Sequence, residues 1–295
     1  MTRKRTPSVG SWLFRKPWKS PKGRGGPLDL AGERLRASQL AVPIRPVLDQ
    51  VEVYCTFIGM GHSGSSLVGS LLTAHPEMVI AHELDALRFL QAGFSRDQIC
   101  GLLVERDASF TQRGRRWGKY QYNVPGQWQG RFERLRVLGD KKAYQSTLQL
   151  GAHPKLLRKL RNTMQIPLRF VHVVRNPWDN ITTVSKRHNL DLREAARRYF
   201  ELNDMLVEIR SRLDHDELVE VRHEELVVGI EDRLGEVCAA LGVKVDARYL
   251  ENCSTLLYPS PHTTRHDTAW TDELVDWVGS RVDRYSFLEG YTPLE

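Results

Sequence analysis

The sequence predicts an α/β fold of three layers, in which a mainly parallel, doubly wound sheet is flanked by helices. Two observations lead to this prediction. Short β-branched and aromatic runs alternate along the chain with segments of helical periodicity, and strands that alternate with helices pair in parallel and are covered on both faces. The first apolar run also leads through closely spaced glycines into a helical segment, an arrangement that presents main-chain N–H groups to an anion.

Each strand is expected at a short apolar run bounded by glycine, proline or charge. These runs lie at residues 51–58, 78–81, 135–139, 168–174 and 217–222. Helices are expected where apolar residues recur every three or four positions, or where proline can occupy a first turn. They are predicted at residues 65–74, 84–89, 95–105, 154–161, 192–213, 231–241 and 271–284, with another directly after residue 177. Residues 111–136 carry no sustained period and are expected to form an irregular, aromatic and basic insertion.

Charge divides the chain into two parts. The 295 residues carry a formal net charge of +7, yet residues 1–26 contain eight Lys or Arg and no acidic residue. The remainder therefore has a net charge of −1, which argues against specific nucleic-acid binding by the folded body. We predict that residues 1–50 form a basic, largely disordered extension and that residues 51–295 form one folded domain. The extension is expected either to solubilise the chain or to make weak contact with an anionic membrane surface or polyanion.

Cysteine and hydropathy patterns favour a cytoplasmic protein. The four cysteines, Cys55, Cys100, Cys238 and Cys253, show no C-x-x-C spacing, so we expect reduced thiols. No apolar run approaches the ~20 residues that cross a bilayer, and no signal-peptide core follows the basic N-terminus.

The stretch "CTFIGMGHSGSSLVGSLL", residues 55–72, predicts an anion site but fits more than one pattern. Its glycines match the G-x-G-x-x-G of a dinucleotide fold, with Glu83 or Asp85 about 20 residues further on as the ribose carboxylate. The same stretch resembles a nucleoside-triphosphate loop, but Ser65 occupies the place of the lysine that such a loop requires. The hydroxyls of Ser63, Ser65 and Ser66 suit phosphate or sulfate oxygens, whereas the dinucleotide pattern does not explain them. An NAD(P)-dependent oxidoreductase therefore stays open on the loop alone.

A second group of residues indicates a phosphate monoester. In "FVHVVRNPWDNITTVSKRH", residues 170–188, Arg175 ends a predicted strand and Thr183 lies eight positions later, inside the next helix. A guanidinium together with hydroxyls is a suitable receptor for a dianionic phosphate. A dinucleotide enzyme has no need for such a site so far along the chain.

The order and spacing of these segments resemble the sulfotransferase family. The resemblance rests on "FIGMGHSGSSLVGSLLTAHP", Glu83, "VVRNPWDNITTVSKRH", "VRHEELV" (221–227) and "HTTRHDTAW" (262–270), and it covers about residues 53–291. It implies a P-loop NTPase-like sulfotransferase fold and transfer of a sulfuryl group from 3′-phosphoadenosine 5′-phosphosulfate (PAPS) to an acceptor hydroxyl by in-line displacement. No metal is expected, because cationic side chains of the protein supply the positive charge.

The resemblance also implies residue roles. Residues 61–67 would cradle the 5′-phosphosulfate, with Arg175 and Thr183 on the 3′-phosphate and Arg265 as a further phosphate contact. Glu83 would be the base, and His62 and Lys141 would stabilise charge on the transferring group. The loop members are Gly61, His62, Ser63, Gly64, Ser65 and Ser66.

Two departures from the family pattern leave alternatives open. Many relatives have Lys or Arg where His62 stands, and a histidine can act there only when protonated or as a neutral N–H donor. Asp140-Lys141-Lys142 replaces the Lys-Thr-His of the cytosolic relatives. Glu83 can instead be a ribose or structural carboxylate, and Lys141 a solvated surface lysine. His262 and His266 have an i, i+4 spacing, but no cysteine pair completes a zinc site.

The acceptor is expected to be a small molecule or a glycan. The insertion combines aromatic and arginine side chains, which suit a sugar or an anionic acceptor; carbohydrate, lipid, peptide tyrosine and phenol all fit. A non-catalytic nucleotide-binding protein with a polyanion-docking tail is the remaining alternative.

Overall fold

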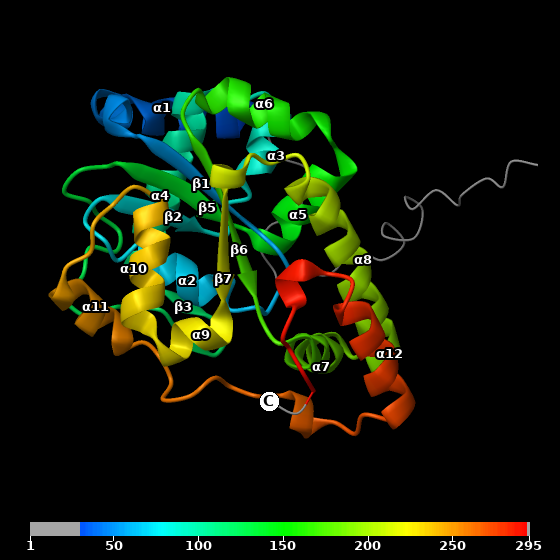
Figure 1. Ribbon diagram of the computed structural model, residues 1–295. Coiled ribbons are helices and arrows are strands. Elements are labelled where there is room, and N and C mark those ends of the chain that lie inside the picture. The colour runs from blue at the N-terminus through cyan, green and yellow to red at the C-terminus, as the bar shows by residue number, and fades with distance from the viewer. Residues whose placement is uncertain (1–29, 294–295) are drawn as a thin grey trace, which may run out of the picture.

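Five parallel strands form the central sheet, in the order β2-β5-β1-β6-β7 (Figure 1). The structure is a computed structural model that describes residues 30–293. The predicted mainly parallel sheet is confirmed, and every predicted strand is present. The strands are β1 (Val53–Ile58), β2 (Met78–His82), β5 (Val137–Lys141), β6 (Leu168–Val174) and β7 (Leu218–Arg222).

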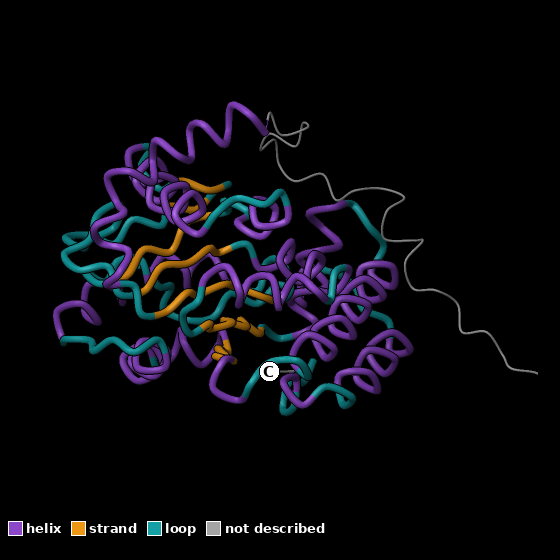
Figure 2. The backbone as a smooth tube through the Cα atoms, turned by 90° about the horizontal axis from the view of Figure 1, so that it is seen from above, coloured by secondary structure: helices purple, strands orange, loops and turns teal. Residues whose placement is uncertain are grey.

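Helices cover both faces of this sheet, as predicted for three layers, and Figure 2 shows the strands between two groups of helices. Alternate side chains of β1 point to opposite faces, so Tyr54 and Ile58 join one buried cluster while Cys55 and Phe57 join the other. The second face is covered by α2 (Ser65–Leu72), α9 (His223–Val228), α10 (Ile230–Ala240) and α11 (Ala247–Ser254). The first face is covered by α1 (Leu30–Ile44), α3 (Ala86–Gln91), α4 (Arg96–Gln112), α5 (Ala143–Ala152), α6 (Lys155–Met164), α7 (Pro177–His188), α8 (Leu192–Arg210) and α12 (Asp272–Val282).

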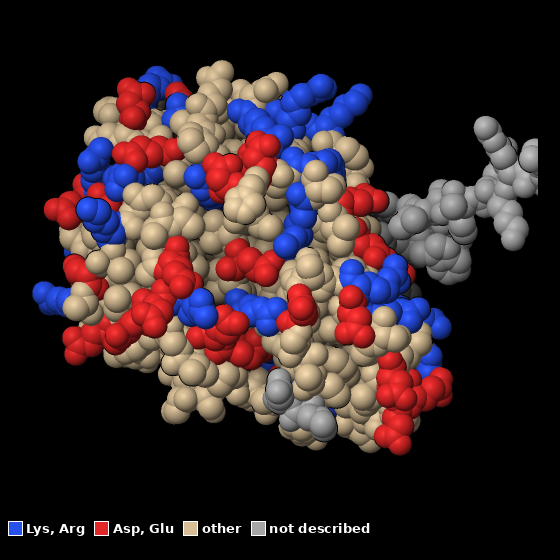
Figure 3. Space-filling view, viewed as in Figure 1, with Lys and Arg blue, Asp and Glu red and all other residues tan. Residues whose placement is uncertain are grey.

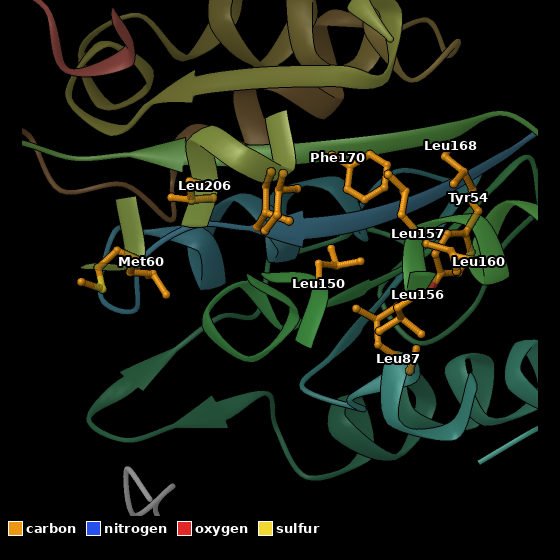
Figure 4. Close-up of a cluster of buried hydrophobic side chains, with 14 of the residues drawn as sticks. Tyr54, Met60, Leu87, Leu150, Leu156, Leu157, Leu160, Leu168, Phe170 and Leu206 are labelled. Atoms are coloured by element: carbon orange, nitrogen blue, oxygen red, sulfur yellow. The ribbon is translucent and has the colours of Figure 1, made fainter. Parts of the chain in front are cut away.

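The core on the first face shows why α6 forms where it does. Leu156, Leu157 and Leu160 recur at helical spacing and all three side chains are buried against the sheet, near Tyr54 and Phe170 (Figure 4). Burial of each leucine stabilises the fold by about 1.5–3 kcal/mol. Pro154 precedes the first turn, as expected from the missing N–H of proline.

Residues 30–50 correct the prediction of a disordered extension up to residue 50. They form α1 and a 3₁₀ turn (Arg45–Gln50), and α1 packs along α4. The contact is close: a Cβ on Gly101 of α4 would lie 2.9 Å from the main-chain nitrogen of Ala41. No hydrophobic period marks α1 in the sequence, because two of its three buried residues are the alanines Ala37 and Ala41, and the third, Ile44, is its last residue. The prediction for residues 1–29 lies outside the described residues.

The insertion is irregular, as predicted, but a buried ion pair fixes it. A short hairpin, β3 (Arg116–Trp117) and β4 (Tyr120–Gln121), is its regular part. Arg115, just before the hairpin, is fully buried and donates to Asp107 of α4 at 2.8 Å. The second oxygen of Asp107 accepts the Gly130 N–H at 2.9 Å. One carboxylate therefore ties both ends of the insertion to α4.

Charge on the folded body is mixed in sign, and Figure 3 shows Lys and Arg interspersed with Asp and Glu over the face in view. This agrees with the net charge of −1 expected for the chain after residue 26. Within residues 30–293, no helix is both long and apolar enough to span a bilayer.

The carboxyl ends of the strands position the functional residues. The chain leaves β1 in one direction to β2 and β5, and later builds β6 and β7 on the other side of β1. Such a reversal opens a crevice at the carboxyl edge of a parallel sheet. The segments that follow Ile58, His82, Lys141 and Val174 therefore meet at one edge, and these segments contain the predicted site residues.

Candidate functional site

The glycine loop between β1 and α2 (residues 59–64) has an unusual backbone. Gly59, His62 and Gly64 have φ angles of 121°, 66° and 96°, and only glycine adopts such values without strain. The loop is fixed from inside: the Gly59 N–H donates to Thr147 Oγ1 at 2.8 Å, and the Ser63 hydroxyl donates to the Met60 carbonyl at 2.9 Å. The loop is therefore preformed, and the hydroxyl of Ser63 is committed to the loop itself.

Gly64 is required for a second reason, which identifies a residue not predicted as part of the site. A Cβ at position 64 would lie 2.4 Å from Nδ1 of His223, the first residue of α9. That Nδ1 atom is buried and has no hydrogen-bond partner in the structure. Burial lowers the pKa of His223 to about 4, with Arg175 contributing, so the ring is neutral at pH 7. The sequence signal was the "VRHEELV" segment, which was quoted for the resemblance without a role for its histidine.

The N-terminus of α2 opens onto the crevice. Gly64 precedes the first turn and no side chain caps it, so the amides of the first turn lack a side-chain acceptor and carry the positive end of the helix dipole. Ser66 Oγ, in that turn, accepts a hydrogen bond from Lys141 Nζ at 2.8 Å. The loop and the end of β5 thus meet at this serine.

Glu83 lies between two ammonium groups. Its carboxylate oxygens contact Lys141 Nζ and Lys142 Nζ at 2.5 Å each. Burial alone would raise the pKa of Glu83, but the two lysines outweigh it and hold that pKa at about 2. The Lys141 side chain is 3% exposed, which excludes the alternative of a solvated surface lysine. Its stem passes over Gly69 of α2, where a Cβ would approach Lys141 Cγ to 2.9 Å.

His62 is neutral in this environment. Burial lowers its pKa to about 3, and the neighbouring Arg187, His188 and Arg175 act in the same direction. Its ring lies 5.8 Å from that of His188. Of the two forms expected from the sequence, the geometry favours the neutral N–H donor.

At the other end of the loop, Arg175 contacts two main-chain carbonyls. It donates to the His62 carbonyl at 3.2 Å and to the His262 carbonyl at 2.6 Å, and its buried Nε has no hydrogen-bond partner within the described part of the chain. The Thr183 hydroxyl lies 3.0 Å from the Thr264 hydroxyl. Arg175 and Thr183 therefore face the same segment, residues 262–267, which we call the C-terminal strap.

The strap is anchored by a buried ion pair on α7. Asp179 accepts the main-chain N–H groups of Thr264 and Arg265 at 2.6 and 2.7 Å and the Arg265 guanidinium at 2.7 Å. The Arg265 side chain is 6% exposed. The guanidinium is therefore committed to Asp179, and its role as a phosphate contact stays a prediction.

Comparison with known proteins identifies the family to which this arrangement belongs. A model described as the sulfotransferase family matches residues 56–247, more than half of the chain. The chain belongs to the sulfotransferase family. It is accordingly a sulfotransferase enzyme, and the dinucleotide interpretation of the glycine loop is wrong.

Solved structures of sulfotransferases are similar to this one at low sequence identity. The sulfotransferase domain of the Synechococcus PCC 7002 olefin synthase is 16% identical, with a TM-score of 0.50 over 79% of this chain and 94% of that domain. The domain from the curacin biosynthetic pathway is 15% identical, with a TM-score of 0.47 over 80% and 98%. Sulfotransferase STF9 from Mycobacterium avium is 12% identical, with a TM-score of 0.46 over 88% and 84%. The first of these supports the fold. No curated protein matches the chain.

In this sulfotransferase the insertion reaches the glycine loop. His82, at the end of β2, is buried and stacked on Phe110 with ring centroids 4.3 Å apart, and Trp117 of the hairpin packs on its edge. At 2% exposed, His82 is part of the packing between β2 and the insertion. Tyr122, after the hairpin, hydrogen-bonds Ser66, while burial raises the pKa of that tyrosine to about 12. The sequence placed Tyr122 near the acceptor but gave no signal for its contact with the loop.

Among residues 30–293 of the sulfotransferase, no three His, Cys, Asp or Glu side chains form a cluster that could hold a metal ion. The structure brings Glu83, Lys141 and Ser66 into one contact network at one end of the loop. It places Arg175 and Thr183 at the other end, against the strap.

Proposed function

We propose that this sulfotransferase uses PAPS as its donor and transfers the sulfuryl group to an acceptor hydroxyl by in-line displacement. One observation carries the proposal. The carboxyl edge of the sheet brings together an uncapped helix N-terminus, the Lys141–Glu83 pair and a buried guanidinium that has an unused N–H. The helix N-terminus can bind one anion, and the Lys141–Glu83 pair beside it supplies a cation and a carboxylate. The Arg175 guanidinium, at the other end of the loop, can bind a second anion.

The residues present fit such a donor. The amides of the first turn of α2, together with Ser65 and Ser66, would hold the 5′-phosphosulfate. Arg175 has an unpaired buried Nε, and its other contacts are neutral carbonyls. A phosphate dianion would satisfy this guanidinium better than carbonyl oxygens do, with Thr183 beside it. These assignments give the 3′-phosphate to the strap end of the loop.

When bound, the donor supplies an activated sulfuryl group on a phosphate leaving group. The chain's own part is electrostatic. Lys141, the α2 amides and the neutral N–H of His62 would stabilise the charge that develops on the sulfuryl and phosphate oxygens, and in a largely buried site such contacts are strong. Lys141 is already held at the loop by Ser66, so little reorganisation is needed.

Glu83 is proposed as the base. A carboxylate with a pKa of about 2 is fully ionised at neutral pH but weakly basic. Its basicity increases when Lys141 turns its charge from Glu83 toward a bound anion, because loss of a neighbouring positive charge raises a carboxyl pKa. Donor binding and activation of the base would then be coupled through Lys141. The competing role, a ribose or structural carboxylate, predicts no such dependence.

The acceptor is proposed to be a small molecule or glycan that enters beside the insertion. Trp117 packs on His82, and Tyr122 lies beside Tyr120, which is 40% exposed. Aromatic faces of this kind suit the apolar faces of sugar rings or phenols.

The test is calorimetric titration with adenosine 3′,5′-bisphosphate, the spent donor. We expect micromolar or tighter binding to the wild type and a loss of about 1.5–3 kcal/mol, roughly 10- to 150-fold in Kd, in Arg175→Ala. Arg233→Ala, which removes an exposed guanidinium on α10, is the control and should bind as the wild type does. If the wild type does not bind the bisphosphate, PAPS is not the donor.

A further inference from the structure

The turn that carries Glu83 is strained. Glu83 has φ = 60° and Asp85 has φ = 70°, so two non-glycine residues out of three are left-handed between β2 and α3. Side chains with a Cβ rarely adopt this conformation, and it persists only where the surroundings impose it. Helix α3 consequently begins at Ala86, two residues later than the sequence predicted.

One buried carboxylate imposes this conformation. Asp140 of β5 is 2% exposed, and its two oxygens accept the N–H groups of Leu84 at 3.0 Å and Ala86 at 2.7 Å. These amides flank Asp85, and the Leu84 amide directly follows Glu83. The Glu83 N–H itself donates to the Lys141 carbonyl at 3.1 Å. The end of β5 thus holds three amides within four residues of the turn.

We propose that Asp140 is a positioning residue for sulfuryl transfer: it holds the turn in its strained form and thereby fixes the carboxylate of Glu83 between the two lysines. The inference rests on the proposed function, because it assigns Asp140 to the same site as Glu83. Asp140 acts on the main chain and does not touch the reacting groups.

Strand geometry separates this role from that of a counter-ion for Lys141. Neighbouring side chains on β5 point to opposite faces of the sheet. Lys141 crosses the α2 face and reaches Ser66, whereas Asp140 lies on the other face, where its oxygens meet the turn. Removal of the Asp140 charge should therefore act through the backbone of residues 83–86.

The surroundings of Asp140 allow its protonation to be followed. Burial raises its pKa to about 6, while the two amide bonds oppose that shift. The charged and titratable groups that face it are Tyr54 and Cys55 of β1, Glu83 and Asp85 of the turn, Arg106 of α4 and the adjacent Lys141. Since the folded-state pKa lies above that of a free aspartate, the charged clamp is present above pH 6 and weakens as the pH falls through 6.

The first experiment compares Asp140→Asn with Asp246→Asn, which makes the same change at the N-cap of α11. The readouts are calorimetric binding of adenosine 3′,5′-bisphosphate and release of sulfate from ³⁵S-labelled PAPS, with water in place of the acceptor. For Asp140→Asn we expect binding within twofold of wild type and sulfate release reduced at least tenfold. Unchanged release, or a parallel loss of binding, would overturn the proposal. Absence of binding to the wild type itself would instead refute the proposed donor.

A second substitution tests the strain directly. Glycine adopts φ = 70° without strain. In Asp85→Gly the turn should therefore keep its conformation with less help from the Asp140 hydrogen bonds. We expect the double variant Asp140→Asn/Asp85→Gly to release sulfate at least threefold faster than Asp140→Asn alone. The control is Asp140→Asn/Asp85→Ala, which removes the same carboxylate and its bond to Gln149 but does not free φ. Equal rates in the two double variants would contradict a positioning role.

The third measurement needs no variant, no donor and no turnover. Amide hydrogen exchange of the unsubstituted protein, corrected for the intrinsic pH dependence, should show at least fivefold weaker protection of Leu84 and Ala86 at pH 5 than at pH 7.5. The control is the Ile80 N–H on β2, which is bonded to the non-titrating hydroxyl of Thr73 at 3.1 Å. Absence of protection at Leu84 and Ala86 at pH 7.5 would overturn the clamp, whatever the fate of the proposed donor.

Discussion

The two ends of the glycine loop are built on different principles. At the Glu83 end, Glu83, Lys141 and Lys142 are charged groups that contact one another, with Ser66 as a neutral link. At the Arg175 end, the guanidinium donates to two neutral carbonyls, and its Nε–H has no partner among residues 30–293. At the Glu83 end, the charged groups are already paired before any ligand arrives. At the Arg175 end, protein carbonyl oxygens occupy the positions where ligand oxygens are expected.

This difference separates catalysis from binding. Charged groups that pair in advance keep a site in place without a ligand, and the two ammonium groups limit the basicity of the carboxylate between them. A guanidinium on neutral carbonyls gains much more when an anion replaces them. We therefore expect changes at the Glu83 end to act on the rate of transfer and changes at the Arg175 end to act on affinity for the bisphosphate.

The largest expected effect is that of Glu83→Gln. The variant keeps the shape of the side chain but cannot accept the acceptor proton, so transfer should fall about 10²- to 10⁴-fold. Bisphosphate binding should be unchanged or tighter, because Lys141 loses its anionic partner. Single-turnover sulfate release and calorimetry measure the two quantities. If sulfate release stays within tenfold of the wild-type rate, Glu83 is a structural carboxylate. The contrast between a catalytic Glu83 end and a binding Arg175 end would then fail.

Asp179→Ala should have the next largest effect, on stability and binding together. It leaves the Arg265 guanidinium buried without its partner, which costs about 3–5 kcal/mol of unfolding free energy. The strap also loses two main-chain bonds, so bisphosphate affinity should fall as well. Urea unfolding and calorimetry provide the measurements.

Lys186→Ala is the matched control for that variant. It removes the exposed strap contact between Lys186 and Asp267 at 3.0 Å, and such pairs contribute about 0–1 kcal/mol. Equal losses of unfolding free energy in Asp179→Ala and Lys186→Ala would show that the buried pair does not anchor the strap.

The smallest expected effect is that of Lys142→Met, which sharpens the comparison within the Glu83 end. Removal of one ammonium group raises the pKa of Glu83 from about 2, and a more basic carboxylate should transfer about two- to threefold faster at neutral pH. A carbon-13 titration of the Glu83 carboxyl measures the pKa, and sulfate release measures the rate. A tenfold loss of rate would instead place Lys142 on the transferring group.

The sequence predicted the sheet better than it predicted the site. Strand β6 is buried on both faces, and five of its seven residues are apolar, which makes it recognisable without knowledge of the fold. Helix α1 was missed because two of its three buried residues are alanines, whose packing depends on the absence of a Cβ at Gly101. A contact between two glycine- or alanine-lined helices leaves no hydrophobic period.

The site residues were found by type and spacing, but their partners were not. Nothing in the order of residues indicates that His223 fills the space beside Gly64, because the two are brought together only by β7. The turn after Glu83 was predicted as the start of a helix at residue 84, because leucine and alanine favour helices and the opposing cause, Asp140, lies more than 50 residues away.

The contact of Gly64 with His223 has a mechanical consequence. The loop is backed by an imidazole with no spare room, and so it cannot yield toward α9 when a ligand presses on it. The wall formed by the C-terminal strap meets Arg175 and Thr183 through hydrogen bonds that a ligand can exchange. The α9 side of the site therefore fixes the position of the ligand. The strap side can exchange its hydrogen bonds, and so it sets the affinity for the ligand.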